Sequence, residues 1–159
     1  FEFTLKRTGD FGTYLYDHAR PGDVWSLTQP AGGVALQPAH LGSPLCMIVR
    51  DYCVPAARAF LRWLQTQARG QRLTLIHEMS SPRERLFEQE LEDFEASDRL
   101  LYYPLEETTL DDGLLEQIFP PGSNPYYYIY GEAADARRFR DLLQQRGVAK
   151  ERLMVERWS

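Results

Sequence analysis

The stretch from Ser43 to Leu64, SPLCMIVRDYCVPAARAFLRWL, decides the fold of this chain. Residues 45–49 are an apolar run typical of a buried strand, residues 50–56 form a turn, and residues 57–64 have the pattern of a helix. A strand that ends in a turn and opens a helix is where α/β proteins usually hold a nucleotide phosphate, because the helix N-terminus presents free N–H groups and a partial positive charge. Phosphate turns normally contain glycine, and this turn contains none.

The composition is that of an ordinary globular protein. The chain has 159 residues, 43% of them hydrophobic and 26% charged, which suits one domain or one domain with an appendage. No apolar run approaches the ~20 residues of a membrane span. The net charge of −5 argues against general nucleic-acid binding. The two cysteines give no disulfide framework, so we expect a reduced, cytoplasmic setting, and the spacing of histidines and cysteines predicts no metal site.

From residue 43 onward, strand patterns alternate with helix patterns. The predicted strands are residues 45–49, 73–77, 100–103, 126–130 and 153–155. The predicted helices are residues 57–64, a segment that starts at Ser81-Pro82, residues 110–119 and residues 133–145. We expect Ser81 to cap its helix, Pro104 to close the third strand and Gly147 to stop the last helix. Five strands with intervening helices predict an α/β fold with a parallel, doubly wound, Rossmann-like sheet over residues 43–159.

Residues 1–42 have a different pattern of predicted secondary structure. They predict a half-buried antiparallel strand at residues 1–6, a short helical piece at 14–18 and a second strand at 24–28. Two strands and a helical turn are too little for an independent β domain. We therefore interpret residues 1–42 as the end of a larger barrel.

The order of these pieces resembles the ferredoxin–NADP reductase superfamily over nearly the whole chain. Members typically read G-x-x-S/T-x-x-L before a P-G-D turn, and here residues 9–15, GDFGTYL, precede Pro21-Gly22-Asp23. The stretch QPAGG at residues 29–33 stands in place of the family's G-P-x-G-G-like segment, and residues 130–158 follow the family's ending in order and spacing. The resemblance implies the C-terminal part of a flavin-binding barrel in residues 1–42 and a nicotinamide-nucleotide domain in residues 43–159.

Two motifs depart from the family pattern. Where the family has G-G-T-G-I-A-P, residues 50–56 read RDYCVPA, so a positive φ angle in this turn would carry a steric cost. The carboxylate of Asp51 would repel phosphate, whereas the guanidinium of Arg50 would pair with it, and both outcomes remain open. The family's C-G-P-P stretch is Tyr130-Gly131-Glu132-Ala133 here, and siderophore-interacting ferric reductases of the same superfamily carry G-E-A at this place.

The resemblance implies two sets of site residues. Tyr130 and Glu132 lie beside the nicotinamide and are the implied catalytic residues. The implied cofactor-binding residues are Gly12, Thr13, Arg50, Asp51, Tyr52, Cys53, Val54, Pro55, Ser80, Gly131 and Trp158. Thr13 would meet a flavin phosphate. Trp158 has either a cofactor-stacking role or a sheet-edge packing role. Cys53 is a weaker candidate for a nucleophile near a helix N-terminus, because no base is identified beside it.

These residues lead to two hypotheses. The first is a portion of a flavin-dependent oxidoreductase that transfers hydride from NAD(P)H to FAD or FMN, with electrons passing to a ferredoxin or an iron–sulfur domain. The second is a non-catalytic interaction or ligand-sensing module of the same fold, which the glycine-free turn favours. The family's R-x-Y-S/T flavin motif is missing, so we expect this chain alone to hold flavin poorly. The preferred nucleotide, the electron acceptor and the oligomeric state stay open.

Overall fold

The computed structural model describes residues 4–29 and 32–158. The chain divides into two compact units, Phe1–Gly32 and Gly33–Ser159.

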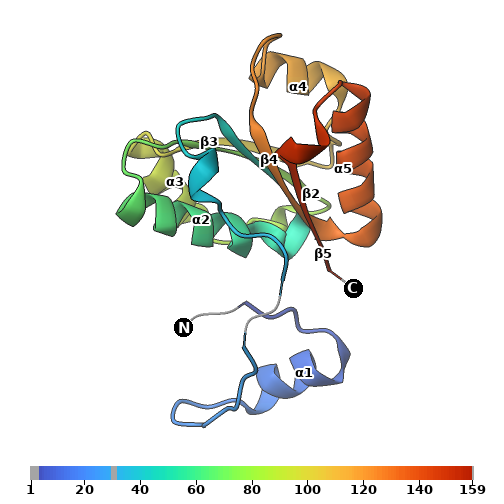
Figure 1. Cartoon of the computed structure of the whole chain (residues 1–159). Coiled ribbons are helices and arrows are strands. Elements are labelled where there is room, and N and C mark those ends of the chain that lie inside the picture. Colours follow the sequence, from blue (N-terminus) through green and yellow to red (C-terminus); the bar gives the residue numbers. More distant parts are fainter. Residues whose placement is uncertain (1–3, 30–31, 159) are drawn as a thin grey trace. The chain divides into compact units, whose positions relative to one another are not determined.

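The second unit is built on a five-stranded parallel sheet (Figure 1). Its strands are β1 (Leu45–Arg50), β2 (Leu73–Met79), β3 (Leu100–Glu106), β4 (Tyr126–Glu132) and β5 (Leu153–Trp158). They lie in the order β3-β2-β1-β4-β5, and every neighbouring pair is parallel. This topology confirms the predicted α/β, doubly wound, Rossmann-like fold. The strand order reverses between β1 and β4, which places a crevice at their carboxyl ends.

Helices cover both faces of the sheet (Figure 1). The helices of this unit are α2 (Val54–Gln67), α3 (Glu88–Ala96), α4 (Asp112–Ile118) and α5 (Ala133–Gln145). The side chains of β1 alternate between the two layers: Met47 packs with α2 and α3, whereas Ile48 packs with α4 and α5. Because both faces are covered, β1 is a continuous apolar run rather than an alternating one. None of the helices in the described ranges has the length and apolar character needed to cross a bilayer.

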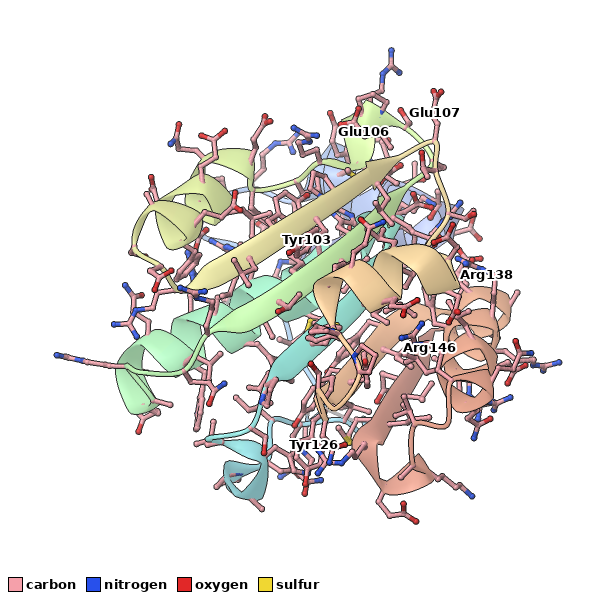
Figure 2. All side chains as sticks on the ribbon, turned by 90° about the horizontal axis from the view of Figure 1, so that it is seen from above. Tyr103, Glu106, Glu107, Tyr126, Arg138 and Arg146 are labelled. Carbon is pink, nitrogen blue, oxygen red and sulfur yellow. The ribbon has the colours of Figure 1, made fainter. Side chains whose placement is uncertain are left out.

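Several boundaries differ from the sequence prediction. Pro104 does not close β3, which continues to Glu106, because β3 is an edge strand where a missing N–H is tolerated (Figure 2). Ser81 does act as a cap, with its hydroxyl accepting a hydrogen bond from the Arg83 N–H at 3.3 Å, but it caps a short 3-10 turn, Pro82–Glu84. The α-helix itself begins only at Glu88.

The first unit contains one regular element, α1 (Gly9–His18), among its described residues. The predicted strand at residues 24–28 is wrong, since these residues have no strand pairing. An alternating pattern becomes a strand only where a neighbouring strand accepts its hydrogen bonds, and the described part of this unit supplies none. Of the other predicted strand, residues 1–3 lie outside the described residues and residues 4–6 are not in a strand. The helix is also longer than the predicted 14–18.

A strap of residues 33–42 belongs to the second unit. The Glu156 carboxylate accepts hydrogen bonds from the N–H groups of Gly33 at 3.0 Å and Val34 at 3.1 Å. The Tyr130 hydroxyl donates to the Val34 carbonyl at 3.3 Å, and the N–H of Gln37 donates to the Tyr128 hydroxyl at 3.3 Å. Three apolar strap residues pack against the core on the α2 side, namely Val34, Leu36 and Leu41. The strap is therefore fixed by side chains of β4 and β5.

We expect a chain shortened to residues 33–159 to unfold in one cooperative transition. Shortening it further to residues 43–159 should lower the free energy of unfolding by about 3 kcal/mol, because three partly buried apolar side chains and six hydrogen bonds that involve side chains are lost. Urea denaturation followed by far-ultraviolet circular dichroism measures both values. Equal midpoints for the two chains would contradict the structural role of the strap.

Candidate functional site

The candidate site is the crevice between the carboxyl ends of β1 and β4. At this end β1 runs into a 3-10 turn, Asp51–Cys53, and then into α2, while β4 ends at Glu132 and leads directly into α5. A cavity of about 220 Å³ opens here. Its lining residues are Arg50, Asp51, Tyr52, Cys53, Glu132 and Asp135. Five of these six were among the residues implied from sequence, and Asp135 was missed.

Asp51 has the left-handed backbone conformation that a phosphate turn usually gives to glycine. Its φ angle is +47°, so this glycine-free turn adopts a positive φ angle despite the steric cost of a side chain there. Aspartate tolerates this region better than most residues. The Asp51 carboxylate accepts hydrogen bonds from the Ser80 N–H at 2.7 Å and the Ser80 hydroxyl at 2.9 Å. These bonds hold the strained backbone in place and account for Ser80 at this position.

His77 supports the same turn through a hydrogen bond from the buried interior. Its side chain is fully buried, and its Nε2 lies 2.7 Å from the Asp51 carbonyl oxygen. Because a carbonyl only accepts, Nε2 carries the proton, and Nδ1 then accepts from the Tyr102 hydroxyl at 3.0 Å. Burial lowers the pKa of His77, against the opposing effect of its hydrogen bond to Asp51. The imidazole is therefore neutral. It is not among the residues that line the cavity.

Arg50 is held by carboxylates. Its Nη1 donates to Glu78 at 2.8 Å, and its Nε donates to Asp51 at 3.2 Å. Burial acts to lower the pKa of Arg50, but the hydrogen bond to Glu78 and the charge of Asp51 outweigh burial and raise it. Glu78 is fully buried and also accepts from Arg138 of α5, which is labelled in Figure 2, at 2.5 Å, and from the Leu110 N–H at 2.5 Å. The Arg50 guanidinium is thus the one cation lining the cavity among the described residues, and it is already paired.

Tyr52 and Glu132 join the two sides of the crevice. The Tyr52 hydroxyl donates to Glu132 Oε1 at 3.1 Å. Burial and this hydrogen bond raise the pKa of Tyr52 to about 12, so the phenol keeps its proton. Burial, followed by the charge of Asp51, raises the pKa of Cys53 to about 11. A protonated thiol is a poor nucleophile, which argues against that role for Cys53.

Gly131 allows β4 and α5 to approach closely at the crevice. A Cβ atom here would lie 3.3 Å from the Asp135 Cβ and 3.5 Å from the Ala136 nitrogen. Val54 is fully buried at the start of α2, and Pro55 occupies the first turn of that helix, where its missing N–H is tolerated.

The structure does not bring all the predicted residues to the cavity. Tyr130 is buried on the α2 face of the sheet, edge-on to Phe60 with ring centroids 6.3 Å apart, and it is not among the residues that line the cavity. The backbone of Trp158 ends β5 in register with that of Glu132, and its side chain lies outside the described part of the structure. Gly12 and Thr13 lie in α1 of the other unit. There, a Cβ on Gly12 would lie 2.3 Å from the Lys6 carbonyl oxygen, so glycine is required by packing.

Two carboxylates of this region were missed from sequence. Glu78 is in the carboxyl end of β2, where the strand-end rule for parallel sheets would have found it. Asp135 is in the first turn of α5, where an acidic residue is common for helix stability and carries little functional signal.

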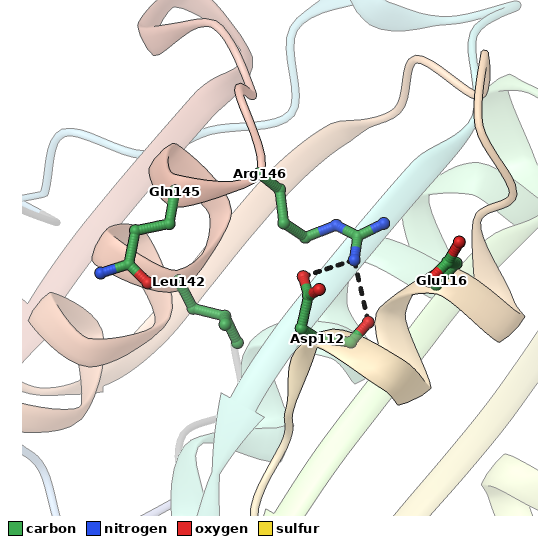
Figure 3. A pocket seen from close by; sticks show the side chains of 5 residues that line it. All are labelled: Asp112, Glu116, Leu142, Gln145 and Arg146. Carbon is green, nitrogen blue, oxygen red and sulfur yellow. Dashed lines mark hydrogen bonds and ion pairs between the residues drawn. The ribbon is translucent and has the colours of Figure 1, made fainter.

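A second cavity, of about 490 Å³, lies between α4 and α5 (Figure 3). It is lined by Asp112, Glu116, Leu142, Gln145 and Arg146. Arg146 Nη1 donates to the Asp112 carboxylate at 2.5 Å and to its carbonyl oxygen at 2.9 Å. These contacts join the two helices.

In the described ranges, no group of three or more metal-ligating side chains is placed to hold a metal ion.

No protein-family model and no curated protein sequence matches this chain. Solved structures do match its fold. The CS-b5R domains of human Ncb5or, in the NAD+ form, superimpose with a TM-score of 0.78 and 17% identity over 95% of this chain and 46% of that one. The cytochrome P450 reductase GcoB of Amycolatopsis gives a TM-score of 0.69 and 15% identity over 80% of this chain and 42% of that one.

A further match is the FAD/NAD-binding domain of nitric oxide dioxygenase from Vibrio cholerae, with a TM-score of 0.67 and 17% identity. It covers 96% of this chain and 65% of that one. The chain shares the fold of the NAD-binding domains of ferredoxin reductase-family proteins. It spans about half the length of the first two structures that it matches, at 46% and 42%.

The left-handed backbone of Asp51 predicts an unusual order of variants. Asp51→Ala and Asp51→Gly both lose the hydrogen bonds to Ser80, but only alanine keeps the steric cost of a positive φ angle. We therefore expect Asp51→Ala to be less stable than Asp51→Gly by about 1 kcal/mol in urea unfolding. The same pair at Asp93, inside α3, is the matched control and should show the opposite order, because glycine is the poorer helix former. An alanine variant at residue 51 that is as stable as the glycine variant would contradict the assigned conformation.

The buried, neutral His77 predicts a loss of stability in acid. Its pKa is lowered on folding from the ordinary value of 6.5, so the unfolded chain binds more protons below that pH. Between pH 7.5 and pH 5.5, His77 should account for a decrease of about 1 kcal/mol in the free energy of unfolding. Urea titrations of the wild type and of His77→Gln at both pH values measure this share as the difference between their pH dependences. A His77→Gln dependence equal to that of the wild type would contradict the assignment.

Proposed function

We propose that this chain is the nicotinamide-nucleotide-binding portion of a flavin-dependent NAD(P)H oxidoreductase. The observation that carries the proposal is the crevice at the reversal of strand order. There, a turn with a left-handed residue leads from β1 into α2, as in nucleotide-binding α/β proteins. One of the matching structures is an NAD+ form, and the match extends over 95% of this chain.

The residues around the crevice fit a nucleotide in part. The frame suits a pyrophosphate, because the N-terminus of α2, with its partial positive charge, and the guanidinium of Arg50 lie on the β1 side of the crevice. Glu132 and Gly131 lie on the β4 side, where the nicotinamide is expected. When bound, NAD(P)H would supply the hydride, and this chain's share would be to bind and orient the nucleotide. Tyr130 would act only through packing, since its side chain points into the core.

The remainder of the electron-transfer path is also a proposal. FAD or FMN would be the hydride acceptor, with Thr13 near its phosphate, and a ferredoxin or an iron–sulfur domain would receive the electrons in a cytoplasmic setting. The first unit exposes many large apolar side chains: Leu5, Phe11, Tyr14, Tyr16, Val24, Trp25 and Leu27. We propose that the remaining strands of a flavin-binding barrel cover this surface, because isolated soluble units rarely leave so much apolar area in water.

A second function is favoured by the charge of the cavity. Three carboxylates line it, from Asp51, Glu132 and Asp135, and its guanidinium is already paired. Such a lining opposes phosphate. In this alternative the chain is a non-catalytic interaction or ligand-sensing module that keeps the fold without the nucleotide.

Calorimetric titration with NADH and with NADPH separates the two functions. We expect saturable binding of at least one nucleotide with a Kd below about 1 mM. Arg50→Gln should weaken that binding about ten-fold, because one charge-assisted contact to phosphate is lost. Arg69→Gln, two residues beyond the C-terminal end of α2, is the matched control and should bind like the wild type. The absence of heat with both nucleotides would favour the non-catalytic module.

A further inference from the structure

We propose that the hydrogen bond between Tyr52 and Glu132 is a latch that keeps the crevice closed until an incoming nucleotide breaks it. This inference rests on the proposed function and adds a gate to the same site. The latch consists of the Tyr52 hydroxyl, which follows β1, and the Glu132 carboxylate, which ends β4. Since the crevice lies between the ends of these two strands, a 3.1 Å bond between them spans it.

The closed crevice is too small for a dinucleotide. Its cavity measures about 220 Å³, whereas pockets for small molecules and cofactors usually measure about 300–1,000 Å³. Two of the six lining residues are the latch partners themselves. Their separation would join this cavity to the open end of the crevice and leave the other lining residues in place.

The backbone on both sides of the latch is fixed. On the β1 side, Asp51 is held by Ser80 through its carboxylate and by His77 through its carbonyl group. On the β4 side, the chain is paired with β5 up to residue 132, and Gly131 packs tightly against α5. Opening therefore requires rotation of two side chains rather than movement of a loop, so the latch is the movable part of the crevice.

The chemistry of the latch opposes anions in the closed state. The Glu132 carboxylate lines the cavity together with Asp51 and Asp135. A phosphate that enters must replace the Tyr52 donor on Glu132 or turn that carboxylate away. The latch thus keeps the Glu132 carboxylate in the lining of the empty crevice.

Two substitutions separate the hydrogen bond from the charge. Tyr52→Phe removes the bond and keeps the Glu132 charge, whereas Glu132→Gln removes the charge and keeps an acceptor for the Tyr52 hydroxyl. If the latch limits access, Tyr52→Phe should bind NADH or NADPH about five-fold more tightly in calorimetric titration, because the competent state is more populated. Tyr103→Phe, on the edge strand β3 (Figure 2), and Glu92→Gln, on α3, are the matched controls and should bind like the wild type.

Three outcomes decide the proposal. Tighter binding by Tyr52→Phe, with unchanged controls, supports the latch. Unchanged or weaker binding by Tyr52→Phe overturns it, including the case in which only Glu132→Gln binds more tightly, since charge alone would then exclude the nucleotide. If neither the wild type nor any variant binds either nucleotide, the proposed function fails and the latch has no nucleotide to exclude.

A double-mutant cycle tests the latch without any nucleotide. Urea unfolding of Tyr52→Phe, Glu132→Ala and the double variant should be non-additive, with a coupling factor of about three in the unfolding equilibrium constant. Additive effects would overturn the contact itself. Coupling without nucleotide binding would show that the contact exists and that the proposed function has failed, so the two failures are distinguishable.

Discussion

The crevice depends on one buried carboxylate. Glu78 is completely shielded from water, and it accepts hydrogen bonds from Arg50, Arg138 and the Leu110 N–H. These partners come from β1, α5 and the segment before α4, so a single group on β2 ties four parts of the domain together. A buried charge of this kind is tolerated only when its partners satisfy it, and removal of one partner from such a group typically costs about 3–5 kcal/mol. This constraint decides the direction of the Arg50 guanidinium and therefore the charge of the site.

The turn after β1 has the backbone of a nucleotide-binding turn and different side chains. A left-handed residue is present, but it is Asp51 rather than glycine. Its carboxylate accepts hydrogen bonds from Ser80 and Arg50. The carboxylate nevertheless stays in the cavity lining together with two others. The backbone geometry thus suits phosphate, whereas the negative charge of the lining weakens phosphate binding. The same crevice is therefore compatible with an oxidoreductase portion and with a non-catalytic module.

Eight of the residues predicted from the family pattern separate into three groups in the structure. Arg50, Asp51, Tyr52, Cys53 and Glu132 line one cavity. Tyr130 packs in the core, although it is only two positions from Glu132, because its ring is held by Phe60 and by the strap. Gly12 and Thr13 belong to the other unit. A motif places residues in order along the chain, but it does not say which of them reach the same space.

The sequence by itself determined the parallel sheet, the alternation of strands and helices, and the position of the crevice. These features depend on local periodicity and on the general rule that parallel strands present their carboxyl ends at one edge. Only the tertiary structure decided that residues 24–28 form no strand, that Asp51 takes a positive φ angle, and that Tyr52 reaches Glu132. The last contact joins residues 80 positions apart. Strand pairing, strained backbone and contacts across a crevice all depend on partners that are distant in the chain. A local sequence pattern does not predict such partners.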